Sequence, residues 1–216
     1  MVKTIISWEK RFESMNSRIV IIAIAGLLAV SFVFASTSIA TSDPSQIYFL
    51  LGKYYFNNND YENAIKYLEK SIELSQDSAK GYYNLGIAYY YNKEYSQAVQ
   101  NLKKAVGLDP NYAKAHYSLA LLYYKNNDLD NAINYLSKTI ELEPSNPNAN
   151  FDIAVAYVDR FRAKESAGVI SSDLGDLRKG LQYYNKVLEL DSEFAHASSN
   201  AKIVQEVLNT YEEAFK

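Results

Sequence analysis

The side chains that could perform chemistry in this sequence are few and scattered. The chain has two histidines, His116 and His196, and no cysteine, so a Cys-based zinc site and a disulfide framework are excluded. No Ser/His/Asp or His-x-x-His arrangement surrounds either histidine, and the sequence has no glycine-rich phosphate loop. Glu141 and Glu143 do not form an acid/base pair, because residues two apart on a helix point to different sides. The sequence therefore predicts no catalytic residue, no metal site and no cofactor, and it favours non-covalent binding.

Pairs of amphipathic helices that recur along the chain would position a binding site. Residues 79–112 read as two helices with a turn between them, and the pattern returns in 45–78, in 113–146 and, with an insertion, in 147–192. A period of 34 residues indicates stacked helix-turn-helix units, none of which can bury its apolar face alone. One face of each first helix carries a recurring four-residue set. These sets are Tyr48, Leu51, Gly52 and Tyr55; Tyr82, Leu85, Gly86 and Tyr89; His116, Leu119, Ala120 and Tyr123; and Asn150, Ile153, Ala154 and Tyr157.

The second helices and the turns follow the same period. The small and apolar positions of the second helices are Ala64, Leu68 and Ser71; Ala98, Leu102 and Ala105; and Ala132, Leu136 and Thr139. Turns at 58–60, 92–94 and 126–128 join the two helices of the first three units. Asparagine in these turns tolerates the left-handed conformation that ends a helix, and Asp or Glu then suits the start of the next helix. Pro110 and Pro144 close the second and third units, where a helix must stop.

The repeated pattern resembles the tetratricopeptide repeat (TPR) family over roughly residues 45–192. Besides the period, the residues that carry the resemblance in the second unit are Leu85, Gly86, Tyr89, Ala98, Asp109 and Pro110. The resemblance implies an all-α fold, an α-solenoid of helix-turn-helix, TPR-like repeats that form a right-handed superhelix. It also implies a concave groove that binds a partner.

In this family the groove is lined by motif positions two, five, nine and twelve of the first helices. By resemblance, the candidate groove residues here are Phe49, Lys53, Lys80, Tyr83, Asn84, Ile87, Tyr90, Lys114, Tyr117, Leu121, Tyr124, Phe151 and Val155. This aromatic and aliphatic surface, with lysines at its rim, suits an extended or helical segment with apolar side chains. Tyrosines at positions five and twelve also partly support packing in the family. The aliphatic residues at position nine argue against the family's carboxylate-clamp mode, which needs a set of Lys, Asn and Arg side chains.

The sequence therefore predicts a non-enzymatic scaffold or adaptor that binds a protein or peptide partner. An alternative is self-association, in which a second copy covers the aromatic surface and the chain forms a homo-oligomer. A fragment of an enzyme is disfavoured, because the chain lacks the polar clusters that catalysis needs. The near-balanced net charge of −3 argues against nucleic acid as the partner.

An uninterrupted apolar run, residues 19–35, precedes the repeats, and no charge falls between Arg18 and Asp43. Extended through residue 40, a helix here is about 33 Å long, which is enough to span a bilayer. We expect a transmembrane signal anchor at 19–40. A buried core helix is disfavoured, because the run is apolar on every face and the repeats do not need it.

The charges on either side of this run predict its orientation. Four Lys or Arg residues precede it, whereas only Lys53 follows within about 20 residues. The positive-inside rule then places residues 1–18 in the cytosol and the repeats, after a linker at 41–44, on the extracytoplasmic side of a single-pass membrane protein. The alternative is a cleaved signal peptide and a secreted protein, because residues 38–40 have the small-x-small character of a cleavage site.

Two irregular segments complete the expected organisation. By strict period, about 14 residues are inserted between the helices of the fourth unit, at about 163–176. This insertion reads as a loop, or as a lengthened helix followed by a loop, and it is either a tolerated surface loop or a functional face. Residues 193–216 predict a last helix that caps the array and shields its final interface. Both His116 and His196 fall on a packing position of a first helix.

Overall fold

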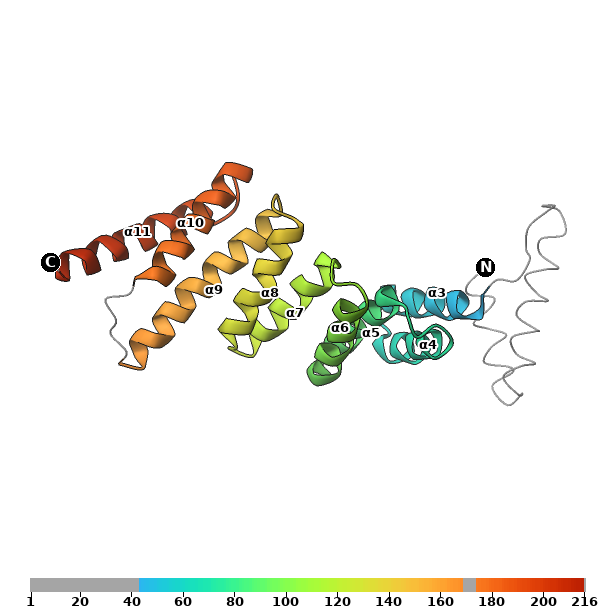
Figure 1. Cartoon of the computed structure of the whole chain (residues 1–216). Helices are drawn as coiled ribbons and strands as arrows, with labels where there is room; N and C mark the ends of the chain where they lie inside the picture. The colour runs from blue at the N-terminus through green and yellow to red at the C-terminus, as the bar shows by residue number, and fades with distance from the viewer. Residues whose placement is uncertain (1–42, 169–173, 216) are drawn as a thin grey trace. The chain divides into compact units, whose positions relative to one another are not determined.

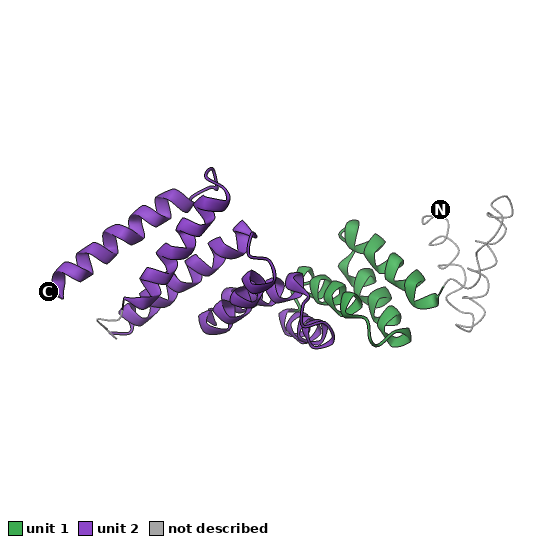
Figure 2. Cartoon of the chain, turned by 45° about the horizontal axis from the view of Figure 1, so that its top comes forward, with its two compact units in different colours: residues 1–94 green, residues 95–216 purple. Residues whose placement is uncertain are grey.

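The computed structural model describes residues 43–168 and 174–215; of these, the residues up to Glu94 form one compact unit, unit 1, and those from Tyr95 onward form a second, unit 2 (Figure 2). The described residues fold into helices and turns. In chain order (Figure 1) the helices are α3 (Pro44–Asn57), α4 (Tyr61–Leu74), α5 (Ala79–Tyr91), α6 (Tyr95–Leu108), α7 (Ala113–Lys125), α8 (Leu129–Leu142), α9 (Pro147–Ser166), α10 (Gly175–Leu190) and α11 (Ala197–Ala214). The predicted segment 1–18 and anchor 19–40 lie outside the described residues. Within the described ranges, every helix is too short or too polar to cross a membrane.

Unit 1 packs α3 against α4, and α4 against α5. The Asp43 side chain caps α3 by accepting a hydrogen bond from the Ser45 backbone N–H at 3.0 Å. The buried Ser71 hydroxyl donates to the Ser45 carbonyl at 2.8 Å and so ties α4 to the start of α3. Near the middle of α3, a Cβ atom on Gly52 would lie 2.6 Å from Leu68 Cγ. The glycine therefore allows α3 and α4 to approach closely, as the recurring small residue predicts.

The predicted turns between helices adopt left-handed backbone conformations. Asn59, Lys93 and Asn127, the middle residues of the three turns, have φ angles of 60°, 66° and 59°. The following Asp60 and Asp128 each accept a hydrogen bond, at 3.2 Å, from the backbone N–H three residues later. These aspartates cap the next helix, and the positive end of the helix dipole at its N-terminus favours their negative charge. The repeated turn is therefore confirmed, including the left-handed residue that ends each first helix.

The periodic small and apolar residues of both helices form the core. All nine predicted positions of the second helices in the first three repeats are buried. The aliphatic and small residues of the first helices in all four repeats are buried too. In unit 2, one cluster joins α7, α8 and α9 through Ala120, Leu136 and Ile153. A second cluster joins α9, α10 and α11 and includes Val158 and Leu177. The stacked arrangement that the period predicts is thus present in each unit.

The insertion in the fourth unit is helical at its beginning. Helix α9 continues to Ser166, and Phe161 on this extension is buried in the cluster with α10 and α11. Leu174 and Leu177, at the other end of the insertion, are buried in the same cluster. Of the two forms that the sequence allowed, the structure shows the lengthened helix; residues 163–168 of the insertion are exposed, whereas Leu174 near its end belongs to the core.

The start of the last helix differs from the prediction. Helix α11 begins at Ala197 rather than at residue 193, because a turn in which Asp191 accepts from the Glu193 backbone N–H (3.0 Å) comes first. His196 has a φ of 66° and is exposed at this helix start, so its predicted packing role was wrong. His116 is buried, and its Nε2 lies 2.9 Å from the Pro110 carbonyl oxygen, so its packing role is confirmed.

Candidate protein-binding face

In unit 1, the candidate residues of α3 and α5 contact one another. Phe49 is buried, and the Nζ atoms of Lys53 and Lys80 lie 5.9 Å and 5.6 Å from its ring centroid. The Asn84 side-chain amide donates to the Lys80 carbonyl at 2.7 Å. Half-buried candidates on the same helix are Tyr83, Ile87 and Tyr90. Phe49 is thus a packing residue with cation–π contacts, and the exposed part of this set is its lysines.

In unit 2, two tyrosine–aspartate hydrogen bonds join α7 directly to α9. The Tyr117 hydroxyl donates to Asp152 Oδ2 at 2.6 Å, and the Tyr124 hydroxyl donates to Asp159 Oδ2 at 2.5 Å. We refer to them as the two Tyr–Asp pairs. On each helix the two partners are two turns apart, so both pairs lie on the same face. This face is therefore held together by side-chain hydrogen bonds as well as by the apolar core.

Between the two Tyr–Asp pairs lie aliphatic side chains. Leu121 on α7 is 40% exposed, and Val155 on α9 is half-buried. Phe151 on α9 packs edge-on against Tyr184 with ring centroids 5.5 Å apart, so it mainly supports the packing of α10. Lys114 is exposed near the start of α7. The structure thus brings Tyr117, Leu121, Tyr124 and Val155 together on this face.

A pocket of about 120 Å³ continues this surface from α9 to α11. The residues that line it are Val155, Val158, Asp159, Arg162, Tyr184, Asn200, Ile203 and Val204. Polar contacts lie around its apolar part. Arg162 Nη1 is 3.3 Å from Asp159 Oδ1, and the Asn200 amide donates to the Tyr184 hydroxyl at 3.2 Å. We call the two Tyr–Asp pairs, Leu121 and this pocket together the binding face.

Burial sets the charge states on the binding face. Burial, with hydrogen bonds to carboxylates, raises the pKa of Tyr117 and of Tyr124 far above the ordinary value of 10.0. Both hydroxyls therefore remain neutral donors. Burial also raises the pKa of Asp152, and the hydrogen bond from Tyr117 offsets only part of that effect. Asp152 is thus a carboxylate whose surroundings oppose its charge.

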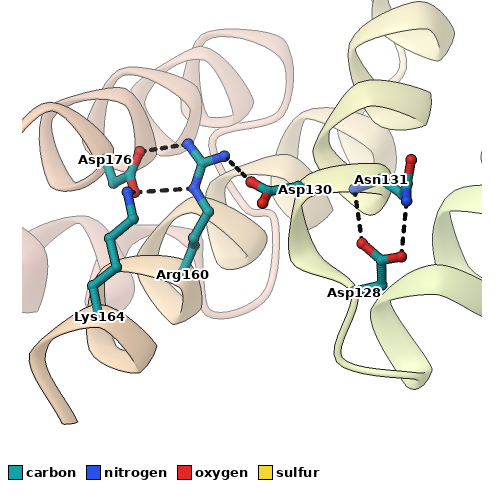
Figure 3. A network of polar contacts seen from close by, with 6 residues as sticks. All are labelled: Asp128, Asp130, Asn131, Arg160, Lys164 and Asp176. Atoms are coloured by element: carbon teal, nitrogen blue, oxygen red, sulfur yellow. Dashed lines mark hydrogen bonds and ion pairs between the residues drawn. The ribbon is translucent and has the colours of Figure 1, made fainter. Parts of the chain in front are cut away.

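A second polar network, shown in Figure 3, fixes α9 to α8 and α10. The Arg160 guanidinium contacts Asp176 through Nη2 (2.6 Å) and Nε (3.0 Å), and Asp130 through Nη1 (2.6 Å). Lys164 Nζ lies 2.8 Å from Asp176 Oδ2, the oxygen that Arg160 Nε also contacts. Burial alone would raise the pKa of Asp176, but the hydrogen bonds and charges of Arg160 and Lys164 outweigh burial and lower it. This network holds the start of α10 after the insertion.

Sequence reasoning missed the acidic half of the binding face and all of its α11 side. Asp152 and Asp159 do not belong to the motif positions that the resemblance assigns. A signal was nevertheless present, because both hydrogen-bonded pairs are separated by the same 35 residues, one more than the repeat period. Ile203 and Asn200 carried no such signal, since α11 follows the last full repeat.

Comparisons with known proteins agree with this architecture. Models described as TPR repeat or tetratricopeptide repeat match residues 86–127, 45–78, 161–194, 113–146 and 67–100. A search of the curated proteins found no match.

Solved structures also resemble the chain. A crystal structure of MamA is 30% identical with a TM-score of 0.60, and the match covers 70% of this chain and 80% of that one. MamA from Desulfovibrio magneticus RS-1 is 20% identical with a TM-score of 0.63, covering 81% and 96%. YrrB, a TPR protein with an unusual peptide-binding site, is 22% identical with a TM-score of 0.62, covering 75% and 76%. The helices, the repeated turns and these matches together show that the chain belongs to the tetratricopeptide repeat family.

Proposed function

We propose that the chain is a non-enzymatic scaffold that holds a segment of a protein partner against the binding face. The observation that carries this proposal is the 40% exposure of Leu121 between two hydrogen-bonded Tyr–Asp pairs and beside a pocket. A surface that is already ordered loses little conformational freedom when a partner binds. Membership of the tetratricopeptide repeat family and the peptide-binding site described for YrrB support a protein or peptide ligand.

Replacing Leu121 with aspartate should weaken partner binding about tenfold or more, because it places a charge where the partner buries apolar surface. The partner is first identified by crosslinking the full-length protein in intact cells, followed by mass spectrometry. Its affinity is then measured for the wild type and for Leu121→Asp.

Leu108→Asp is the matched control, since Leu108 is equally exposed (42%) but lies at the end of α6. The control should leave the affinity unchanged. Equal affinities for Leu121→Asp and Leu108→Asp would contradict a site at the binding face. If the crosslinked partner is a second copy of the chain, Leu121→Asp should instead shift the protein to a monomer in light scattering.

We also propose that residues 19–40 anchor the protein in a membrane, with the repeats on the extracytoplasmic side. The apolar run and the preceding basic residues support this placement. After alkaline extraction of membranes, the full-length chain should stay in the pellet, and mass spectrometry should recover its N-terminal peptide. Protease added to cells whose outer layers have been permeabilised, with the cytoplasmic membrane intact, should digest the repeats. A soluble chain that begins near residue 41 would instead support the cleaved, secreted form.

A further inference from the structure

We infer that the segment bound at the binding face is basic, with an aliphatic side chain that enters the pocket and Lys or Arg side chains that face Asp152 and Asp159. This inference rests on the proposed function and names the chemistry of the partner. It follows from the two carboxylates on the binding face and from the small number of cations that pair with them.

Asp152 is a half-buried carboxylate without a cation. Its hydrogen-bond partner is the neutral Tyr117 hydroxyl, and none of the ion pairs among the described residues involves it. Burial of an uncompensated carboxylate is unfavourable, and burial raises the pKa of Asp152 accordingly. A cation from a partner would relieve this cost, whereas an acidic partner would increase it.

Asp159 has a cation, but one that a partner can displace. Arg162 reaches Asp159 from the next turn of α9 at 3.3 Å, and its side chain is 62% exposed. Such an exposed pair contributes little stability, typically about 0–1 kcal/mol. Burial raises the pKa of the Tyr184 hydroxyl in the pocket wall. Among the nearby charges, those of Asp159 and Asp152 raise this pKa further and that of Arg162 lowers it. Among the ion pairs of the described residues, the exposed Arg162 is thus the one cation that pairs with either carboxylate, and Lys114 on α7 pairs with neither.

The spacing of the carboxylates sets the spacing of the partner's basic residues. Asp152 and Asp159 are two turns apart on α9, which corresponds to about 10 Å along the helix. In a polyproline II conformation, which has three residues per turn, three residues span about 9 Å at roughly 3.1 Å each, and side chains three residues apart lie on the same face. Val155 and the pocket of about 120 Å³ lie along this path. Since a dry cavity of about 150 Å³ holds a benzene molecule, this pocket suits one aliphatic side chain.

Two synthetic peptides test the inference on the full-length protein. One carries two lysines three residues apart with a leucine between them, and the other has glutamates in place of the lysines. In fluorescence anisotropy at low salt, the lysine peptide should bind at least about tenfold more tightly, and added salt should reduce the difference. Tighter binding of the glutamate peptide, or binding of neither peptide, would overturn the inference.

Two charge-changing variants should alter the affinity for the lysine peptide in opposite directions. Asp152→Asn should weaken its binding about fivefold or more, whereas Arg162→Ala should strengthen it by removing the competing cation. Glu189→Gln removes a negative charge from the exposed surface of α10 and should have no effect. An Asp152→Asn variant that binds the lysine peptide as the wild type does would contradict the inference.

The Leu121→Asp variant separates this inference from the proposed function. Peptide binding that depends on Leu121 but not on Asp152 leaves the binding face in place and refutes only the basic partner. If neither peptide binds, the native partner's sensitivity to Leu121→Asp still decides the proposed function.

Discussion

Replacing Gly180 with alanine should destabilise unit 2 by about 1–3 kcal/mol, the usual range for overpacking a core. A Cβ atom at Gly180 would lie 2.8 Å from Val158 Cγ2 and 3.2 Å from the carbonyl oxygen of Ala154. Val158 is part of the buried cluster, and the Ala154 oxygen belongs to the backbone of α9, so neither can move away freely. Helix α10 must therefore shift away from α9. Urea unfolding of the full-length protein, followed by circular dichroism, would measure the loss.

Replacing Gly107 with alanine should instead stabilise the protein. Gly107 lies in α6, and an added Cβ atom would have no neighbour within 4 Å. Alanine favours a helix over glycine by about 0.5–1 kcal/mol. Gly107→Ala should therefore raise the unfolding midpoint slightly while Gly180→Ala lowers it. Equal midpoints for the two variants would show that close packing of α9 and α10 does not depend on Gly180.

Replacing Arg160 with alanine should cost about 1–3 kcal/mol, because it leaves a largely buried carboxylate with an incomplete set of partners. The Asp176 side chain is only 11% exposed, and the substitution leaves it with Lys164 alone. Asp130 is mostly exposed and can be solvated by water once the guanidinium is removed. The expected result is a lower unfolding midpoint and loss of order at the start of α10, which hydrogen exchange would detect.

Arg178→Ala is the matched control for Arg160→Ala. Arg178 pairs with Glu212 at 3.0 Å, but both side chains are well exposed, so removing this pair should change stability by less than about 1 kcal/mol. The pH dependence gives a second test. Since the pKa of Asp176 is lowered from 3.8 in the folded protein, its stabilisation is present above that value and is lost as pH falls through the lowered pKa. The difference between wild type and Arg160→Ala should shrink over that range.

The repeated features of the fold could be predicted from the sequence because the same physical requirement recurs in every unit. Leu68, Leu102 and Leu136 lie one period apart, and all three are buried. The turn residues Asn59 and Asn127 were predictable for the same reason, since each must end one helix and allow the next to begin. Features that recur can be recognised without knowing the contacts that they make.

Features that occur once could not be predicted in this way. The Arg160 network depends on which residues follow the insertion, and the sequence has no comparable insertion in the other three repeats. His196 matched a packing position by its number in the repeat, but the turn before α11 places it at an exposed helix start. The acidic half of the binding face required knowledge of which tyrosine hydroxyl meets which carboxylate across two helices.

The two Tyr–Asp pairs also bear on how unit 2 responds to mechanical load. In a solenoid each repeat contacts only its neighbours, so bending and stretching depend on the contacts between adjacent repeats. The hydrogen bonds Tyr117–Asp152 and Tyr124–Asp159 join two successive first helices and oppose their separation. Removing both hydroxyls should make this part of the array softer while leaving its core intact. The stiffness of unit 2 would then be set by the side chains that present its binding face.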